Sequence, residues 1–185
     1  MAFDFDHELQ TAVKSYESRY GARDNRFRFL PVSFHALPYA QTLVDDTSFT
    51  LQIKLDQDAK GQDERLKFQI WHEAVHCLAP VKSMETLWFE EGLAVYSCLY
   101  APHMTRDYRR RCIKGMKSFP AWYAPYEAFK KLKATDEQIK AIHDRAPQRK
   151  FDLVTPELII DVFGTEPTLA SSLCNRLDTT REAKA

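Results

Sequence analysis

Two helix-length segments of this 185-residue chain are apolar over most of their circumference. The first spans about 63–79 and ends before Pro80, and the second spans 85–100. A surface helix needs only one apolar stripe, so helices with this pattern are expected at the centre of a fold. Because only a few residues join the two segments, we expect the helices to pack roughly antiparallel.

The segments around this pair predict a strand and further helices. Residues 48–56 alternate strictly between apolar and polar side chains, the period of a strand with one packed face. Residues 5–20 repeat apolar side chains at spacings of three and four, which predicts a first helix ended by Gly21. Residues 135–147, 155–164 and 169–177 carry the start and stop signals of three later helices.

The chain length favours one domain, 1–185, in which 178–185 form a frayed tail. A core of this size folds without disulfides or a structural metal, so a bound metal would serve chemistry. The four cysteines show no paired spacing and are expected to be reduced thiols. We see neither a signal peptide nor a membrane span, which predicts a cytoplasmic protein.

The acidic and basic side chains balance to a formal net charge of zero. No global field therefore draws the protein to nucleic acid or to an anionic membrane, and neither partner is expected. A local basic run between Arg106 and Lys117 could attract an acidic peptide or nucleic acid. In a neutral chain without aromatic interleaving, we interpret it as a solvated helix face.

The first central helix carries the sequence His72-Glu73-Ala74-Val75-His76. Histidines four residues apart lie one above the other on a helix, so both imidazoles can reach one cation. Glu73 follows the first histidine, where its carboxylate would reach a water at the metal rather than the metal itself. This pattern predicts a zinc site in which His72 and His76 are ligands and Glu73 is the general base.

The second central helix supplies a third ligand. Glu90 and Glu91 stand in the middle of an apolar helix, where an unpaired carboxylate is costly unless it binds a metal or a partner. Adjacent helical residues diverge by about 100°, so only one of the two should bind the ion. A catalytic zinc ion needs three protein ligands and an open fourth position. The other carboxylate has no assigned role at this point.

His-Glu-x-x-His followed by a helix that contains Trp88, Glu91, Gly92 and Ala94 resembles the gluzincin metallopeptidases, the thermolysin-like and aminopeptidase-like group. The resemblance covers roughly 48–100. It implies a zincin-like α+β domain, mainly helical, with a small antiparallel sheet ahead of the motif helix. It also implies that Glu91, before the glycine, is the third ligand of one Zn²⁺ per chain. Residues 48–56 would be the edge strand that pairs with an extended substrate.

The chain departs from the gluzincin pattern in two respects. Some relatives orient a zinc-bound histidine with an acidic residue four positions after the ligand glutamate, and that position is Val95 here. The residue that stabilises the transition state follows no motif, and Tyr123, Tyr126 and His143 are the candidates. The third histidine of other zincins would fall at Lys82, and peptide deformylase needs a cysteine upstream of Cys77 that is absent.

These features predict a zinc-dependent peptidase that acts on peptide or protein substrates. The lack of an amine-binding motif of the large aminopeptidases favours an endopeptidase. Two alternatives stay open: a catalytically silent zincin-fold binding module, and a zinc hydrolase of a non-peptide amide. Oligomeric state and cleavage preference leave no mark in the sequence.

Overall fold

The computed structural model describes residues 3–81 and 86–177. Its helices are α1 (Phe5–Tyr20), α2 (Asp63–His76), α3 (Trp88–Leu99), α4 (Arg106–Met116), α5 (Pro120–Lys130), α6 (Asp136–Arg145), α7 (Pro156–Phe163) and α8 (Pro167–Leu173). Its strands are β1 (Arg28–Phe29), β2 (Ser33–His35), β3 (Gln41–Asp45) and β4 (Thr50–Asp56). The predicted α+β fold, mainly helical with a small sheet ahead of the motif helix, is confirmed.

The sheet is mixed, which differs from the antiparallel sheet that the resemblance implied. β3 pairs antiparallel with β4 along its length, whereas β1 and β2 pair parallel with the beginning and the end of β4. Since a strand has two edges, β1 and β2 occupy the edge that β3 leaves free. They form one strand interrupted around Pro31, which has no N–H to donate to the ladder.

The alternation of 48–56 is confirmed within β4 but not at its start. Leu51, Ile53 and Leu55 are fully buried, as a one-sided strand requires. Phe49 instead lies in the turn before the strand, with φ of 49° and its side chain 38% exposed. Asp45 accepts hydrogen bonds from the N–H groups of Thr47 and Ser48 and so fixes this turn.

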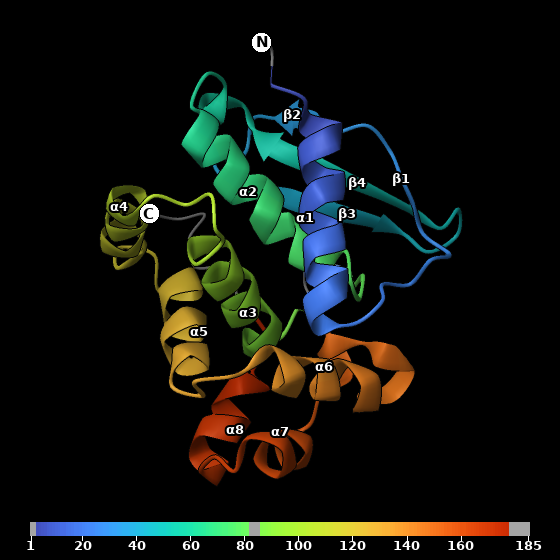
Figure 1. Cartoon of the computed structure of the whole chain (residues 1–185), viewed down its shortest axis with the longest axis vertical. Helices are drawn as coiled ribbons and strands as arrows, with labels where there is room; N and C mark the ends of the chain where they lie inside the picture. Colours follow the sequence, from blue (N-terminus) through green and yellow to red (C-terminus); the bar gives the residue numbers. More distant parts are fainter. Residues whose placement is uncertain (1–2, 82–85, 178–185) are drawn as a thin grey trace.

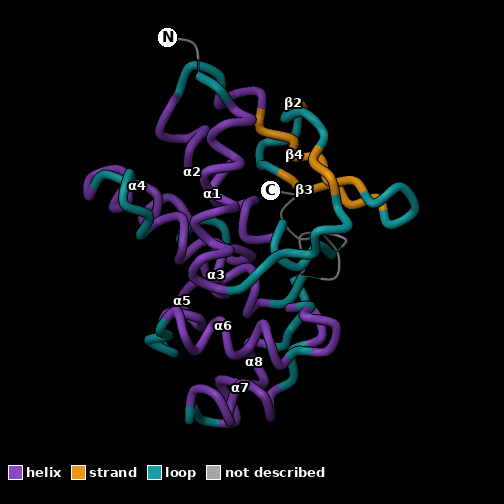
Figure 2. The backbone as a smooth tube through the Cα atoms, turned by 45° about the vertical axis from the view of Figure 1, so that its right-hand side comes forward, coloured by secondary structure: helices purple, strands orange, loops and turns teal. Residues whose placement is uncertain are grey.

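α1 and α2 lie side by side over one face of the sheet (Figure 1). The two helices contact through aromatic rings, with Tyr16 and Trp71 edge to face at 5.5 Å. Figure 2 shows the strands gathered at one end and the helices α3 and α5–α8 filling the other. The junction between these two parts is formed by α2 and α3.

α2 and α3 run in opposite directions and pack together, as the short link predicted (Figure 1). α2 ends at His76, earlier than the predicted 79, because Cys77 caps it and Leu78 turns away. α3 begins at Trp88; the predicted start at 85 lies outside the described residues. Its first N–H group is bound by the C-terminal segment, since Trp88 donates to the carbonyl of Asn175.

The later helices follow the predicted punctuation. Gly21 caps α1, and a complete capping box of Thr135 and Gln138 opens α6. Thr155 caps the start of α7, and Gly164 ends it in the left-handed conformation. α8 ends at Leu173, four residues before the predicted Leu177, and the predicted tail 178–185 lies outside the described residues.

Candidate metal centre

α2 brings His72, Glu73 and His76 to its end beside α3. Ile70, Ala74 and Val75 of the same helix are fully buried in the core, which fixes the rotation of the helix. Both histidines therefore point to the α3 side, one turn apart. Their Nε2 atoms lie 3.3 Å from each other.

Glu91 from α3 completes a triad of donor atoms. One carboxylate oxygen lies 3.4 Å from Nε2 of His72 and the other lies 3.6 Å from Nε2 of His76. One ligand atom from each of the three residues can be chosen so that all lie within 4.8 Å of one another. The three residues that the sequence predicted as ligands thus converge.

The spacing of the triad fits a tetrahedral zinc ion. Ligand atoms about 2.0–2.1 Å from such an ion are separated from one another by about 3.3–3.4 Å. The observed separations are close to this value: 3.3 Å between the two imidazole nitrogens, and 3.4 and 3.6 Å from these nitrogens to the two oxygens of Glu91. Two imidazole nitrogens and one carboxylate oxygen also match the donor set of catalytic zinc sites, which keep the fourth position open.

The charge of the surrounding cluster favours a cation as well. Glu73, Glu90 and Glu91 are 4%, 0% and 3% exposed, and such buried carboxylates need compensation. Within 3–81 and 86–177, their ion pairs are all with His72 and His76. Oε1 of Glu91 is buried without a hydrogen bond to the described residues. A divalent cation would neutralise this excess of negative charge.

Glu90, which the sequence left without a role, lies against His76 from the outside of the triad. Its Oε1 is 2.7 Å from Nδ1 of His76. When Nδ1–H donates to this carboxylate, Nε2 keeps its lone pair for a metal and the ring is fixed in orientation. Glu90 is therefore placed to act as the orienting carboxylate that Val95 does not provide. The two adjacent carboxylates of α3 are the sequence signal for this arrangement. Neighbouring helical residues diverge by about 100°, so the two side chains can reach opposite sides of one imidazole.

Thr42 of β3 is a second contact that sequence reasoning missed. Its hydroxyl donates to Oε2 of Glu73 at 2.7 Å, and the pair is buried. Oε1 of Glu73 lies 4.0 Å from Nε2 of His72, beside the triad but outside it. This is the position that a general base requires. The segment before the turn at Asp45 contains β-forming Thr42 and Val44, a hairpin signal that could have revealed β3.

The titration of the cluster reflects the same contacts. Burial lowers the pKa of His76, but the hydrogen bonds to Glu90 and Glu91 outweigh it, and the net pKa lies well above the ordinary value. Burial raises the pKa of Glu90 despite the nearby His76. Burial also acts to raise the pKa of Glu91, yet the charges of His72 and His76 and the His76 hydrogen bond leave it below its usual range.

The strand expected to bind a substrate is not at an edge. β4 is paired on both sides, by β3 on one edge and by β1 and β2 on the other. Among the described strands, β3 pairs with β4 alone, so its outer edge is the one beside Glu73 that can accept a further strand. The prediction of an edge strand was wrong because alternation of apolar and polar residues indicates a packed face and does not indicate whether the strand edges are paired.

The three candidates for transition-state stabilisation lie in other surroundings. Tyr126 is fully buried in a small cluster with Val95 and Leu99, and Tyr123 packs at the rim of that cluster. His143 is fully buried against Phe151 in a different part of the core. The described contacts of these side chains do not include the triad.

The basic run lies on α4, at the side of the molecule (Figure 1). Two of its arginines contact other elements. Arg109 donates to the carbonyl of Leu99 at the end of α3, and Arg111 pairs with Glu64 of α2 at 3.0 Å. All four cysteines are free, and Cys77 and Cys98 are buried as packing residues.

Within the described residues, none of the helices combines the length and apolarity that crossing a membrane demands. Comparison with protein-family models, curated proteins and solved structures gave no match for this chain.

Proposed function

We propose that this protein is a zinc-dependent hydrolase of peptide bonds, with His72, His76 and Glu91 as the metal ligands. The observation that carries the proposal is the spacing of the donor groups: the two Nε2 atoms lie 3.3 Å apart, and one oxygen of Glu91 lies 3.4 Å from the first while its other oxygen lies 3.6 Å from the second. This spacing suits a tetrahedral ion with one open position. When bound, zinc polarises a carbonyl and lowers the pKa of water.

The chain's own residues divide the remaining work. Glu73 accepts the proton of the attacking water and delivers it to the leaving amine. Thr42 holds one oxygen of that carboxylate at 2.7 Å, so that the other oxygen faces the triad. Glu90 fixes the ring of His76 through the 2.7 Å contact at Nδ1.

The outer edge of β3, which pairs with no other strand among the described residues, supports an extended peptide as the substrate. A strand added along this edge would form main-chain hydrogen bonds, which bind peptides irrespective of their sequence. Thr42 belongs to β3 and contacts Glu73, so a peptide on this edge would pass beside the general base. This placement favours an endopeptidase that cuts within an extended segment.

The test compares two isosteric variants, Glu73→Gln and Glu137→Gln. Glu137 lies exposed on α6, so its replacement controls for the loss of one carboxylate. Zinc content is measured on protein purified without chelator, and hydrolysis is measured on a fluorescently labelled unstructured protein. We expect about one zinc per chain in both variants, and hydrolysis lowered roughly 10²–10⁴-fold in Glu73→Gln alone.

Three results would contradict the proposal. Unchanged hydrolysis by Glu73→Gln would remove this residue from the reaction. A chain that binds no zinc even after incubation with the ion would instead be a zincin-like binding module. Hydrolysis of small amides together with inertness toward every unstructured protein would assign a non-peptide substrate.

A further inference from the structure

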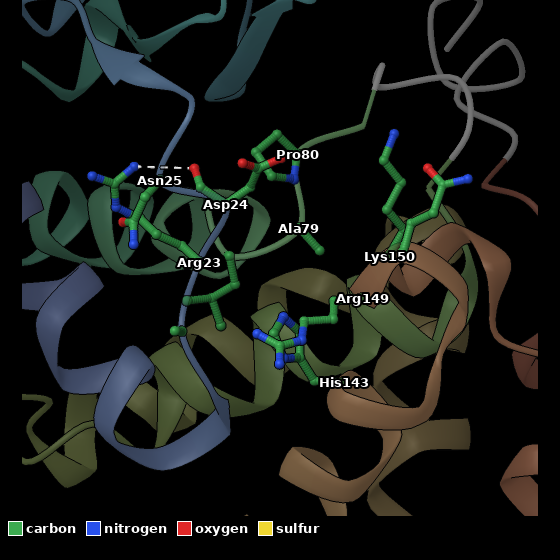
Figure 3. A pocket seen from close by; sticks show the side chains of 11 residues that line it. Arg23, Asp24, Asn25, Ala79, Pro80, His143, Arg149 and Lys150 are labelled. Atoms are coloured by element: carbon green, nitrogen blue, oxygen red, sulfur yellow. Dashed lines mark hydrogen bonds between the residues drawn. The ribbon is translucent and has the colours of Figure 1, made fainter.

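A cavity that none of the triad residues lines lies where the ends of α1, α2 and α6 meet (Figure 3). Its volume is about 250 Å³, far more than the ~10–15 Å³ that a single water needs. Residues from three segments form its wall: 22–25 after α1, 78–80 after α2, and 143–150 at the end of α6. The lining is polar and basic, and its charged members are Arg23, Asp24, Arg149 and Lys150.

His143 lines this cavity with two unsatisfied ring nitrogens. The residue is fully buried, and neither Nδ1 nor Nε2 forms a hydrogen bond with the described residues. The nearest carboxylate contact given by its own helix is Asp144, 3.8 Å from Nδ1 and itself 44% exposed. Buried polar groups are normally paired, so an unpaired imidazole at the wall of a cavity points to a ligand that contacts it.

Two cations at the cavity also lack partners. Within the described chain, the side chains of Arg149 and Lys150 form neither an ion pair nor a hydrogen bond. Arg23 differs, since it donates to the carbonyls of Asp24 and Phe27. The carboxylate of Asp24 is occupied by Arg26, with contacts of 2.6–3.1 Å. The cavity therefore presents two cations without an ion pair to the described residues, while its one carboxylate is paired with Arg26 and also lies within range of the charge of Lys150.

One of these cations, Arg149, lies in a strained turn, and Lys150 follows it with ordinary extended backbone. Gln148 and Arg149 both have a φ of 56°, which side-chain-bearing residues seldom adopt. Consecutive strained residues persist where the surrounding structure requires them, and such residues cluster at ligand-binding sites. Here the turn brings the neighbouring side chains of Arg149 and Lys150 to the same cavity.

We propose that this cavity binds a phosphate group, held by Arg149, Lys150 and a ring nitrogen of His143. A guanidinium binds two phosphate oxygens through its fork, and an ammonium adds a point charge. The imidazole N–H donates to a further oxygen. Burial lowers the pKa of His143, and Arg149 acts in the same direction, so a neutral ring with one N–H is available before binding. The site is independent of the proposed hydrolase activity.

The competing interpretation is that the cations balance the ends of the three helices. Helix C-termini carry partial negative charge, which attracts cations without any ligand. Arg23 does not serve that role with its hydrogen bonds, since the carbonyls of Asp24 and Phe27 lie beyond the end of α1. If the cations only neutralise the helix C-termini, the cavity should not bind anions saturably. Saturable anion binding therefore distinguishes the two interpretations.

The experiment follows backbone amides by NMR while the full chain is titrated with inorganic phosphate, glycerol 3-phosphate or acetate at matched ionic strength. We expect saturable one-to-one shifts at 22–25, 78–80 and 143–150 for the two phosphates and not for acetate. Equal affinity for both phosphates would identify the free ion as the ligand. Tighter binding of glycerol 3-phosphate would identify a phosphate monoester, and both outcomes support the site.

Matched double variants complete the test. Arg149→Ala with Lys150→Ala should weaken phosphate binding at least tenfold, and Arg110→Ala with Lys114→Ala on α4 should leave it unchanged. Arg149 is exposed and Lys150 is half-buried, so both can be replaced without opening the core. Shifts centred on His72 and His76, phosphate binding no tighter than acetate, or equal losses in both double variants would overturn the proposal.

Discussion

Gly92 follows the proposed ligand Glu91 and sits where α3 and α5 approach most closely. A Cβ at this position would lie 2.5 Å from the carbonyl oxygen of Pro125 and 2.5 Å from Cβ of Phe129. Optimal contacts between such atoms are about 3.5–4.0 Å, so Gly92→Ala requires the helices to separate. The obstructing atoms belong to the backbone or lie next to it and cannot rotate away.

The magnitude follows from two opposing terms. Alanine gains about 1 kcal/mol over glycine inside a helix. Overpacking of a tight core costs about 1–3 kcal/mol, and a clash with backbone belongs at the upper end of that range. The net loss is therefore about 2 kcal/mol in the free energy of unfolding, which lowers Tm by about 4–8 °C in a chain of this length.

Gly115→Ala in α4 is the matched control. Nothing lies within 4 Å of a Cβ at Gly115, so this variant should gain about 0.5–1 kcal/mol and melt about 1–4 °C higher. Circular dichroism melts and urea titrations measure both variants. A Gly92→Ala protein as stable as Gly115→Ala would refute the close approach of α3 and α5. Because Glu91 moves with α3, zinc affinity should fall in Gly92→Ala and stay constant in Gly115→Ala.

Three further predictions concern contacts beside the two sites. Glu90→Gln should lower zinc affinity about 10–100-fold by loosening His76, as measured by competition with a chromogenic chelator; an unchanged affinity would exclude an orienting role. Thr42→Val should lower hydrolysis about tenfold or more and leave zinc affinity unchanged, since the lost hydrogen bond to Glu73 is charge-assisted, and Thr42→Ser should restore activity. Burial holds the pKa of folded His143 below 6.5, so below that pH the unfolded chain binds this proton first and stability falls. Urea titrations at pH 7.5 and 5.5 should therefore show a smaller loss in His143→Gln than in the wild type, and equal losses would contradict the assignment.

The sequence predicted the site residues and helix caps whose positions depend only on helix geometry. The spacing of His72 and His76 places them on one face of any α-helix. The two carboxylates of Glu90 and Glu91 in an apolar helix predicted that a cation or another partner binds there. The capping box at Thr135 and the left-handed Gly164 were equally readable, because caps act on residues three or four positions away. These features need no knowledge of what packs against them.

Contacts between segments that lie far apart in the chain could not be predicted from the sequence. Thr42 reaches Glu73 across 31 residues, and nothing local to either residue encodes that hydrogen bond. The position of β4 within the sheet was wrong for the same reason, since its edges are filled by strands whose pairing depends on the whole chain.

The sequence by itself determined that this chain forms central helices carrying two histidines and three glutamates, because periodicity and the cost of burying charge act on short segments. The residues alone left open which glutamate faces the histidine pair, and the resemblance pointed to Glu91. Only the tertiary structure decided that Glu90 lies against His76 and which strand edge lies beside Glu73. It also gathered Arg149, Lys150 and His143 around a cavity shared with residues after α1 and α2. Such arrangements depend on the packing of α2 against α3 and of α6 against α1, and packing is a property of the folded chain.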